Sequence, residues 1–114
     1  GSSVAADTDL DLHVVDAPTS AFGLMVTSTD TMAVANPGGV TGTLCIAGAD
    51  LARHPFVLQT SAAGTLLFEP ALTLIPLGAS GTAVLAGDTR NWQSWFRDGM
   101  SDANFTDAVA VSFD

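Results

Sequence analysis

The sequence of 114 residues contains no lysine, no tyrosine, one cysteine and one glutamate. Without lysine, catalysis through a Schiff base is excluded. Cys45 has no second cysteine to pair with in the chain, so cysteine usage does not indicate the redox compartment. Basic residues are limited to three arginines against twelve acidic residues, which gives a formal net charge of -9. Nucleic acid and anionic membranes are therefore poor partners, because both are bound through basic side chains.

The sequence also lacks internal repeats, linkers and any apolar run near the ~20 residues of a membrane helix. It has a globular composition, since 47% of its residues are hydrophobic and 13% are charged. The length fits one hydrophobic core, so residues 1–114 are predicted to form a single domain. An acidic, lysine-free surface stays soluble at high ionic strength, where like-charge repulsion is screened, which suits a marine or saline extracellular setting.

Glycine and proline interrupt the chain at short intervals, and the segments between them are β-branched or alternating. Residues 9–15, DLDLHVV, alternate between leucine or valine and aspartate or histidine, as in a half-buried strand. Residues 21–28 are predicted to be its partner, and AAG at 62–64 is predicted to join two strands as a hairpin. An edge position, a bulge or a break is expected in the second of these strands at Pro70. About eight short strands and no helix of three turns predict an antiparallel β-sandwich resembling a jelly roll.

Both tryptophans fall in one predicted strand, NWQSWFR at residues 91–97. Successive side chains of a strand point to opposite faces, so Trp92 and Phe96 share the more apolar face, which we expect to point into the sandwich. Trp95 then lies on the outer face between Gln93 and Arg97. A sugar can stack its C–H face on an indole while its hydroxyls form directed hydrogen bonds. Trp95, Gln93 and Arg97 are therefore the candidate ligand-binding residues.

Two other interpretations of this strand leave no ligand site. In the first, Trp95 packs under a loop, with Arg97 stacked on it and paired with Asp98 or Asp107. In the second, a β-bulge reverses the two faces. The solvent exposure of the two indoles distinguishes the three interpretations.

The segment DGMSDANFTD, residues 98–107, is a candidate Ca²⁺ loop. It carries four oxygen-bearing side chains that a loop could direct inward: Asp98, Asp102, Asn104 and Asp107. It lacks the glycine at the sixth position and the distal glutamate of calcium-binding loops. The alternative is a plain turn in which Asp and Asn cap their own backbone. The acidic start at Asp7, Asp9, Asp11 and His13 is expected to be a solvated strand face, because alternate residues lie too far apart to share one ion.

Little in the sequence supports catalysis. Cys45 with His13 or His54 is the only thiol and imidazole combination, and Cys45 lies in the apolar segment TLCIAG, where a thiol is usually inert. Glu69 has no evident carboxylate partner for glycoside hydrolysis. Nucleotide-binding loops, GxSxG and HExxH are absent. We therefore expect a domain that is not an enzyme.

Four segments together resemble a C-terminal all-β domain of large secreted proteins of planctomycetes and similar marine bacteria. They are DAPTSAFGLMVTS, NPGGVTGTLCIAG, GDTRNWQSWFRD and SDANFTDAVAVSF, which span nearly the whole chain. The resemblance implies a non-catalytic module of an exported protein. Such domains often carry a second cysteine where this chain has Ser94. If that position adjoins Cys45, the TLCIAG strand lies near the tryptophan strand.

The sequence thus predicts a secreted, non-catalytic accessory module. The first hypothesis for its role is recognition of polysaccharide through Trp95, Gln93 and Arg97. The alternative is a structural or self-assembling domain that docks on its parent protein or on copies of itself. No cofactor is expected apart from the candidate Ca²⁺ ion.

Overall fold

The computed structural model describes residues 2–97 and 102–114. That part of the chain contains twelve strands and two three-residue 3-10 helices, and every strand pairing is antiparallel. The elements in chain order are η1 Ala5–Asp7, β1 Leu12–Val14, β2 Phe22–Ser28, β3 Met32–Ala35, η2 Pro37–Gly39, β4 Thr43–Ala47, β5 Ala52–Arg53, β6 Leu58–Gln59, β7 Leu66–Phe68, β8 Ile75–Leu77, β9 Ser80–Thr82, β10 Thr89–Arg97, β11 Ala103–Phe105 and β12 Val109–Ser112. The antiparallel β-sandwich is confirmed, with twelve strands in place of the expected eight, because glycine and proline cut several runs into strands of two or three residues.

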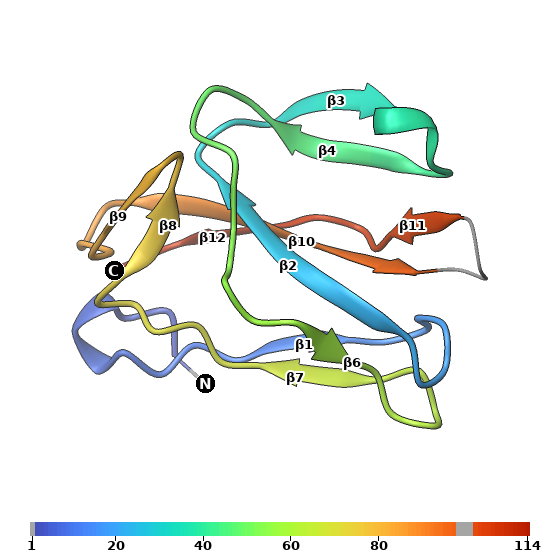
Figure 1. The fold of residues 1–114 in the computed structure, drawn as a ribbon. Helices are drawn as coiled ribbons and strands as arrows, with labels where there is room; N and C mark the ends of the chain where they lie inside the picture. Colours follow the sequence, from blue (N-terminus) through green and yellow to red (C-terminus); the bar gives the residue numbers. More distant parts are fainter. Residues whose placement is uncertain (1, 98–101) are drawn as a thin grey trace.

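The centre of the molecule is a six-stranded sheet built around β10, the longest strand (Figure 1). One edge of β10 pairs with β2, from Asn91 opposite Ser28 to Phe96 opposite Gly23. Its other edge pairs first with β12 and then with β11. β5 and β6 extend the sheet beyond β2. The tryptophan strand is therefore the scaffold to which most other elements are attached.

The inner face of this sheet is covered by the two-stranded β1–β7 ribbon (Figure 1). The predicted alternation in β1 is confirmed, since Leu12 and Val14 are buried while His13 is exposed. The main core consists of Ala5, Leu10, Leu12, Val14, Met25, Phe68, Leu72, Ile75, Val84, Trp92, Phe96 and Phe113. Gly23 lets β2 approach closely there, because a Cβ atom would overlap the Phe96 ring. Burial of these apolar side chains is the main force that closes the two layers.

Two predicted pairings are wrong. β1 pairs with β7, whereas β2 pairs with β10, β5 and β6. The segment 62–64 does form a turn, closed by hydrogen bonds between Ser61, Gly64 and Thr65. It does not join a hairpin, however, because β6 belongs to the central sheet and β7 to the ribbon. The turn therefore carries the chain from one layer to the other. Of the three possibilities expected at Pro70, which were an edge position, a bulge or a break, the structure has a break, since β7 ends at Phe68.

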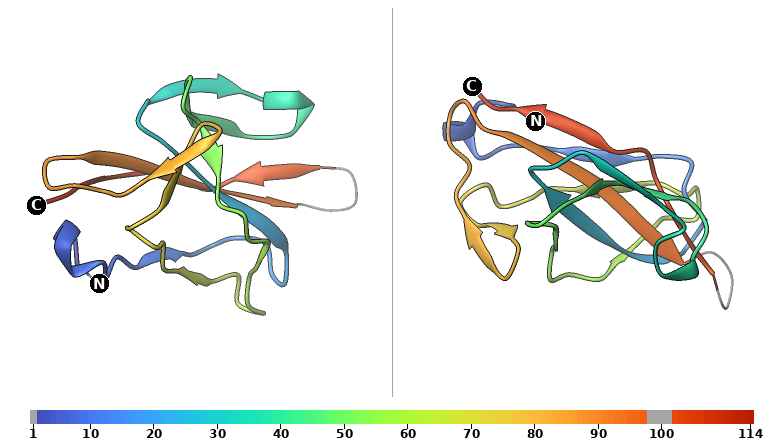
Figure 2. Two further views of the ribbon diagram at one scale, coloured as in Figure 1. Left: turned by 60° about the vertical axis from the view of Figure 1, so that its left-hand side comes forward. Right: turned by 90° about the horizontal axis from the view of Figure 1, so that it is seen from above.

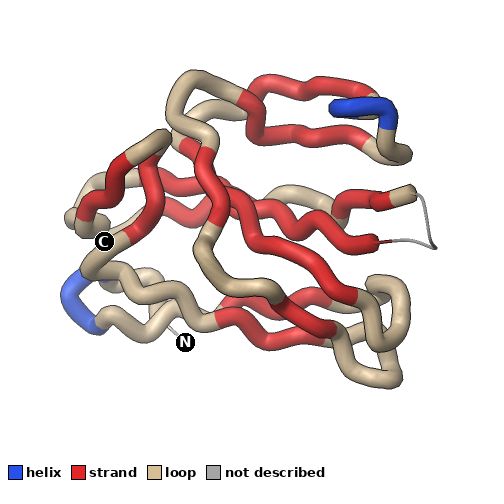
Figure 3. The backbone as a smooth tube through the Cα atoms, viewed as in Figure 1, coloured by secondary structure: helices blue, strands red, loops and turns tan. Residues whose placement is uncertain are grey.

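The β3–β4 hairpin lies over the opposite face of the central sheet, as seen from above in Figure 2. Its tip is the predicted NPGG turn, which contains η2 and two glycines with positive φ, Gly38 and Gly39. Residues Ser3 and Ala5 exchange backbone hydrogen bonds with Asp114, so the two ends of the domain lie side by side. Long loops connect several of the short strands (Figure 3). Among the described residues, no helix is long and apolar enough to cross a membrane.

Candidate functional site

The two indoles point in opposite directions, as the sequence predicted. Trp92 is 1% exposed and packs edge-to-face against Phe113, with ring centroids 6.2 Å apart. Phe96, on the same face, is also 1% exposed. Trp95 lies on the other face of β10 and is half-buried. The bulge that would exchange the faces is not present in β10, whose pairing with β2 runs without interruption.

Trp95 is part of an apolar row that crosses three strands. Its partners in register are Leu24 on β2 and Phe105 on β11, both half-buried, and paired residues of antiparallel strands share a face. Phe22 lies two residues before Leu24 on that face and is 55% exposed. We call Phe22, Leu24, Trp95 and Phe105 the aromatic face. It presents a broad apolar surface next to the hydrogen-bonding side chains of Arg97 and Gln59, both exposed.

Gln93 is on the predicted side of β10 but is buried, with an exposed fraction of 2%. Its Oε1 accepts from the backbone N–H of Cys45 at 2.9 Å, and its Nε2 donates to the carbonyls of Thr43 and Thr106 at 2.9 and 2.7 Å. Gln93 therefore fastens β4 and the β11–β12 connection to β10. A side chain with these three bonds has little capacity left for a ligand.

The Arg97 side chain is exposed and makes no hydrogen bond or ion pair with Asp107 or any other described residue. Asp98, the other partner considered for it, lies outside the described residues. The guanidinium at the end of β10 thus presents its donors to solvent beside the aromatic face.

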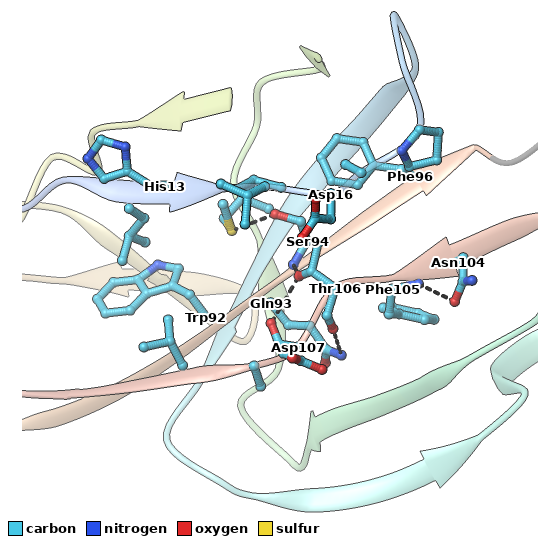
Figure 4. A pocket seen from close by; sticks show the side chains of 18 residues that line it. His13, Asp16, Trp92, Gln93, Ser94, Phe96, Asn104, Phe105, Thr106 and Asp107 are labelled. Carbon is cyan, nitrogen blue, oxygen red and sulfur yellow. Dashed lines mark hydrogen bonds between the residues drawn. The ribbon is translucent and has the colours of Figure 1, made fainter. Parts of the chain in front are cut away.

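The described members of the candidate Ca²⁺ loop do not converge. Thr41 donates to Asp102 through its hydroxyl and its backbone N–H, and Ala103 donates through its N–H; these bonds lower the pKa of Asp102. The Oδ1 of Asn104 accepts from the N–H of Phe105 at 2.8 Å, and Asp107 is exposed. Figure 4 shows Asn104 and Asp107 apart, with Phe105 and Thr106 between them. No group of three or more His, Cys, Asp or Glu side chains is placed to hold a metal in the described part of the chain.

A cleft of about 760 Å³ opens between β1 and the β11–β12 segment. Its floor includes Met25, Trp92, Ser94 and Phe96, and Figure 4 looks into it, with His13 on one side and Asn104 to Thr106 on the other. Within residues 2–97 and 102–114, β1 pairs only with β7, and β12 only with β10. The cleft therefore lies between two strand edges that have no partner among the described residues.

Cys45 is half-buried, and its Sγ lies 3.6 Å from the carbonyl oxygen of Thr43. Neither His13 nor His54 hydrogen-bonds to it. β4 lies beside β10, over the Gln93 face. Ser94 points into the core, where its Oγ donates to the Sδ of Met25 at 3.3 Å. A bridge from Cys45 to this position would have to pass through the sheet.

Comparisons with protein-family models, curated proteins and solved structures find no match to this chain.

Sequence reasoning found Trp95 but missed the rest of the aromatic face. Phe22 lies 73 residues before Trp95 and Phe105 lies ten residues after it, and the strand register brings the three rings to one face. The available signal was the alternation in FGLMVTS, which separates Phe22 and Leu24 from the buried Gly23 and Met25. The burial of Gln93 had no comparable signal, because it depends on the hairpin folding over β10.

Proposed function

We propose that this domain is a non-catalytic accessory module of an extracellular protein and that it binds polysaccharide on the aromatic face. The observation that carries the proposal is the alignment of Trp95 with Leu24 and Phe105, next to the exposed Phe22. The rings of Phe22, Trp95 and Phe105 lie on one face of the sheet, where the C–H faces of successive sugars in an extended chain can stack on them. The resemblance to domains of secreted proteins supports the extracellular location.

The charge of the molecule narrows the class of polysaccharide. A chain with a formal net charge of -9 repels uronic-acid and sulfated polymers. Arg97 and Gln59 can donate to hydroxyl oxygens beside the aromatic face. We therefore expect neutral polysaccharides to bind and anionic ones to bind weakly or not at all. Gln93 is left out of the ligand contacts because its amide is engaged within the fold.

The test is a binding panel of neutral and anionic polysaccharides, read by pull-down and by tryptophan fluorescence. Trp95→Ala should weaken binding at least tenfold, about 1.4 kcal/mol, because it removes the central stacking ring. Trp95→Phe keeps a ring and should retain most of the binding. Phe56→Ala is the matched control, since Phe56 is 65% exposed and lies outside the aromatic face. Unchanged binding in Trp95→Ala, or the absence of binding to every neutral polymer, would contradict the proposal.

A second candidate function, assembly with copies of the same domain, is favoured by the cleft between β1 and β11–β12. Strand edges without partners can pair with a strand of another chain, and apolar side chains line the space between them. The measurement that separates this function from polysaccharide recognition is the oligomeric state in solution.

A further inference from the structure

A second pocket, of about 460 Å³, lies away from the aromatic face. It is enclosed by the segment after β5, the segment after β7 and the β8–β9 hairpin, which gather on one side of the molecule (Figure 1). Apolar side chains dominate its wall: Pro55, Phe56, Phe68, Pro70, Leu74 and Pro76. Both its volume and its lining are those of pockets that hold small molecules.

His54 forms part of this wall and is 4% exposed. Its ring stands edge-to-face against Phe68, with centroids 4.8 Å apart. The indole Nε1 of Trp92 donates a hydrogen bond to His54 Nε2 at 3.2 Å. An indole N–H can only donate, so Nε2 must carry the lone pair, and the proton of the neutral ring is on Nδ1. Burial lowers the pKa of His54 to about 4, which keeps the ring neutral at neutral pH.

The Nδ1–H group of His54 has no acceptor among the described residues. Nδ1 is not among the side-chain atoms of the described residues that are fully buried and have no hydrogen-bond partner. Nδ1 therefore keeps some accessible surface, on a ring that lines the pocket. Because the whole side chain is only 4% exposed, this donor has little contact with water, and an acceptor atom of a ligand in the pocket would supply the missing partner.

We propose that this pocket binds a neutral, mainly apolar small molecule with a carbonyl oxygen that accepts a hydrogen bond from His54 Nδ1. The apolar walls take up the hydrocarbon part of the ligand. Glu69 lies in the same wall and the whole chain is acidic, so a carboxylate ligand is disfavoured. The site is separate from the aromatic face and does not depend on polysaccharide binding.

Acetophenone and ethylbenzene form a pair of probes, because they share the phenyl ring and the two-carbon chain and only the first carries a carbonyl. Binding can be followed in NMR spectra through the Trp92 indole N–H and the His54 ring nitrogens. Acetophenone should shift both sets of signals, and its carbonyl oxygen should accept a hydrogen bond from His54 Nδ1 that ethylbenzene cannot form. The ratio of the two affinities should change about tenfold in His54→Phe, in favour of ethylbenzene, because the carbonyl is then left unpaired in an apolar site.

Variants at the mouth of the pocket provide a test that does not require His54→Phe to fold. Phe56→Ser and Leu74→Ser change side chains that are 65% and 66% exposed, and they should weaken both probes while preserving their ratio. Trp95→Ala should leave both affinities unchanged. The proposal is overturned if neither probe shifts the Trp92 and His54 signals, or if the affinity ratio is the same in the native protein and in His54→Phe.

Discussion

A hydrogen bond between the side chains of Trp92 and His54 links the core to the surface pocket. His54 accepts from the buried indole only in its neutral form. Protonation would remove that acceptor and place a charge beside the Phe68 ring. The state of one imidazole therefore affects the packing of the largest side chain in the core.

We predict that the stability of the domain falls as the pH drops from 6.5 to 4. The pKa of His54 is lowered from 6.5 to about 4 by burial, so between these values the unfolded chain binds a proton that the folded chain does not. The stabilising contribution is complete above pH 6.5 and is lost as the pH approaches 4. The loss amounts to at most about 3 kcal/mol, at 1.36 kcal/mol per pKa unit and before solvent screening reduces it.

The measurement is the free energy of unfolding in denaturant at pH 4.5 and pH 7. His54→Gln keeps an acceptor for the indole but does not titrate, so it should lose less stability than the native protein over this range. His13→Gln is the matched control, since His13 is exposed, and should behave like the native protein. Equal pH dependence in the native protein and His54→Gln would rule out this role of the imidazole.

At the scale of elements, the β3–β4 hairpin is held over the sheet by a few polar contacts. Gln93 binds β4, and Asp102 accepts from Thr41 near the tip. Gly42 lies in the tip with φ +94°, and a Cβ atom there would overlap Asn104 Oδ1. The hairpin thus depends on one glycine for its close approach to β11.

We predict that Gly42→Ala separates the hairpin tip from β11. Amide hydrogen exchange in β4 should become faster, while exchange in β1 and β7 should stay unchanged, because those strands belong to the opposite layer. Gly39→Ala provides the control: Gly39 also has positive φ, +84°, but no atom lies within 4 Å of its added Cβ. If hydrogen exchange in β4 became equally faster in both variants, backbone strain alone would explain the effect.

The strands themselves could be predicted from the sequence, but not all of their partners. The alternation in residues 9–15 and 91–97 predicted which side chains face the core, including the opposite directions of Trp92 and Trp95. The pairing of β1 with β7 was missed, because it depends on the turn at 62–64 crossing between layers. The same limit applies to the burial of Arg90, which is 3% exposed, and to the pocket at His54, since distant segments create both environments.

At the scale of the whole molecule, surface charge and free strand edges act in opposite directions. A formal net charge of -9 makes copies repel one another, whereas the cleft offers apolar side chains and two open edges. The repulsion has a range of about 10 Å at 0.1 M salt and shrinks as salt is added. Apolar contacts and backbone hydrogen bonds do not weaken in the same way.

We therefore predict that the domain is monomeric at low ionic strength and that any association through the cleft becomes stronger with salt. Sedimentation velocity at 10 mM and 500 mM NaCl, over a range of protein concentrations, measures this directly. Val109→Lys places a charge on β12 at the cleft, where Val109 is 46% exposed, and should abolish the association. Val57→Lys, at a 70% exposed position outside the cleft, makes the same change in net charge and should not. Dimers that dissociate as salt is added, or that persist in Val109→Lys, would exclude the cleft as the interface, and a monomer under all conditions would exclude assembly as the function.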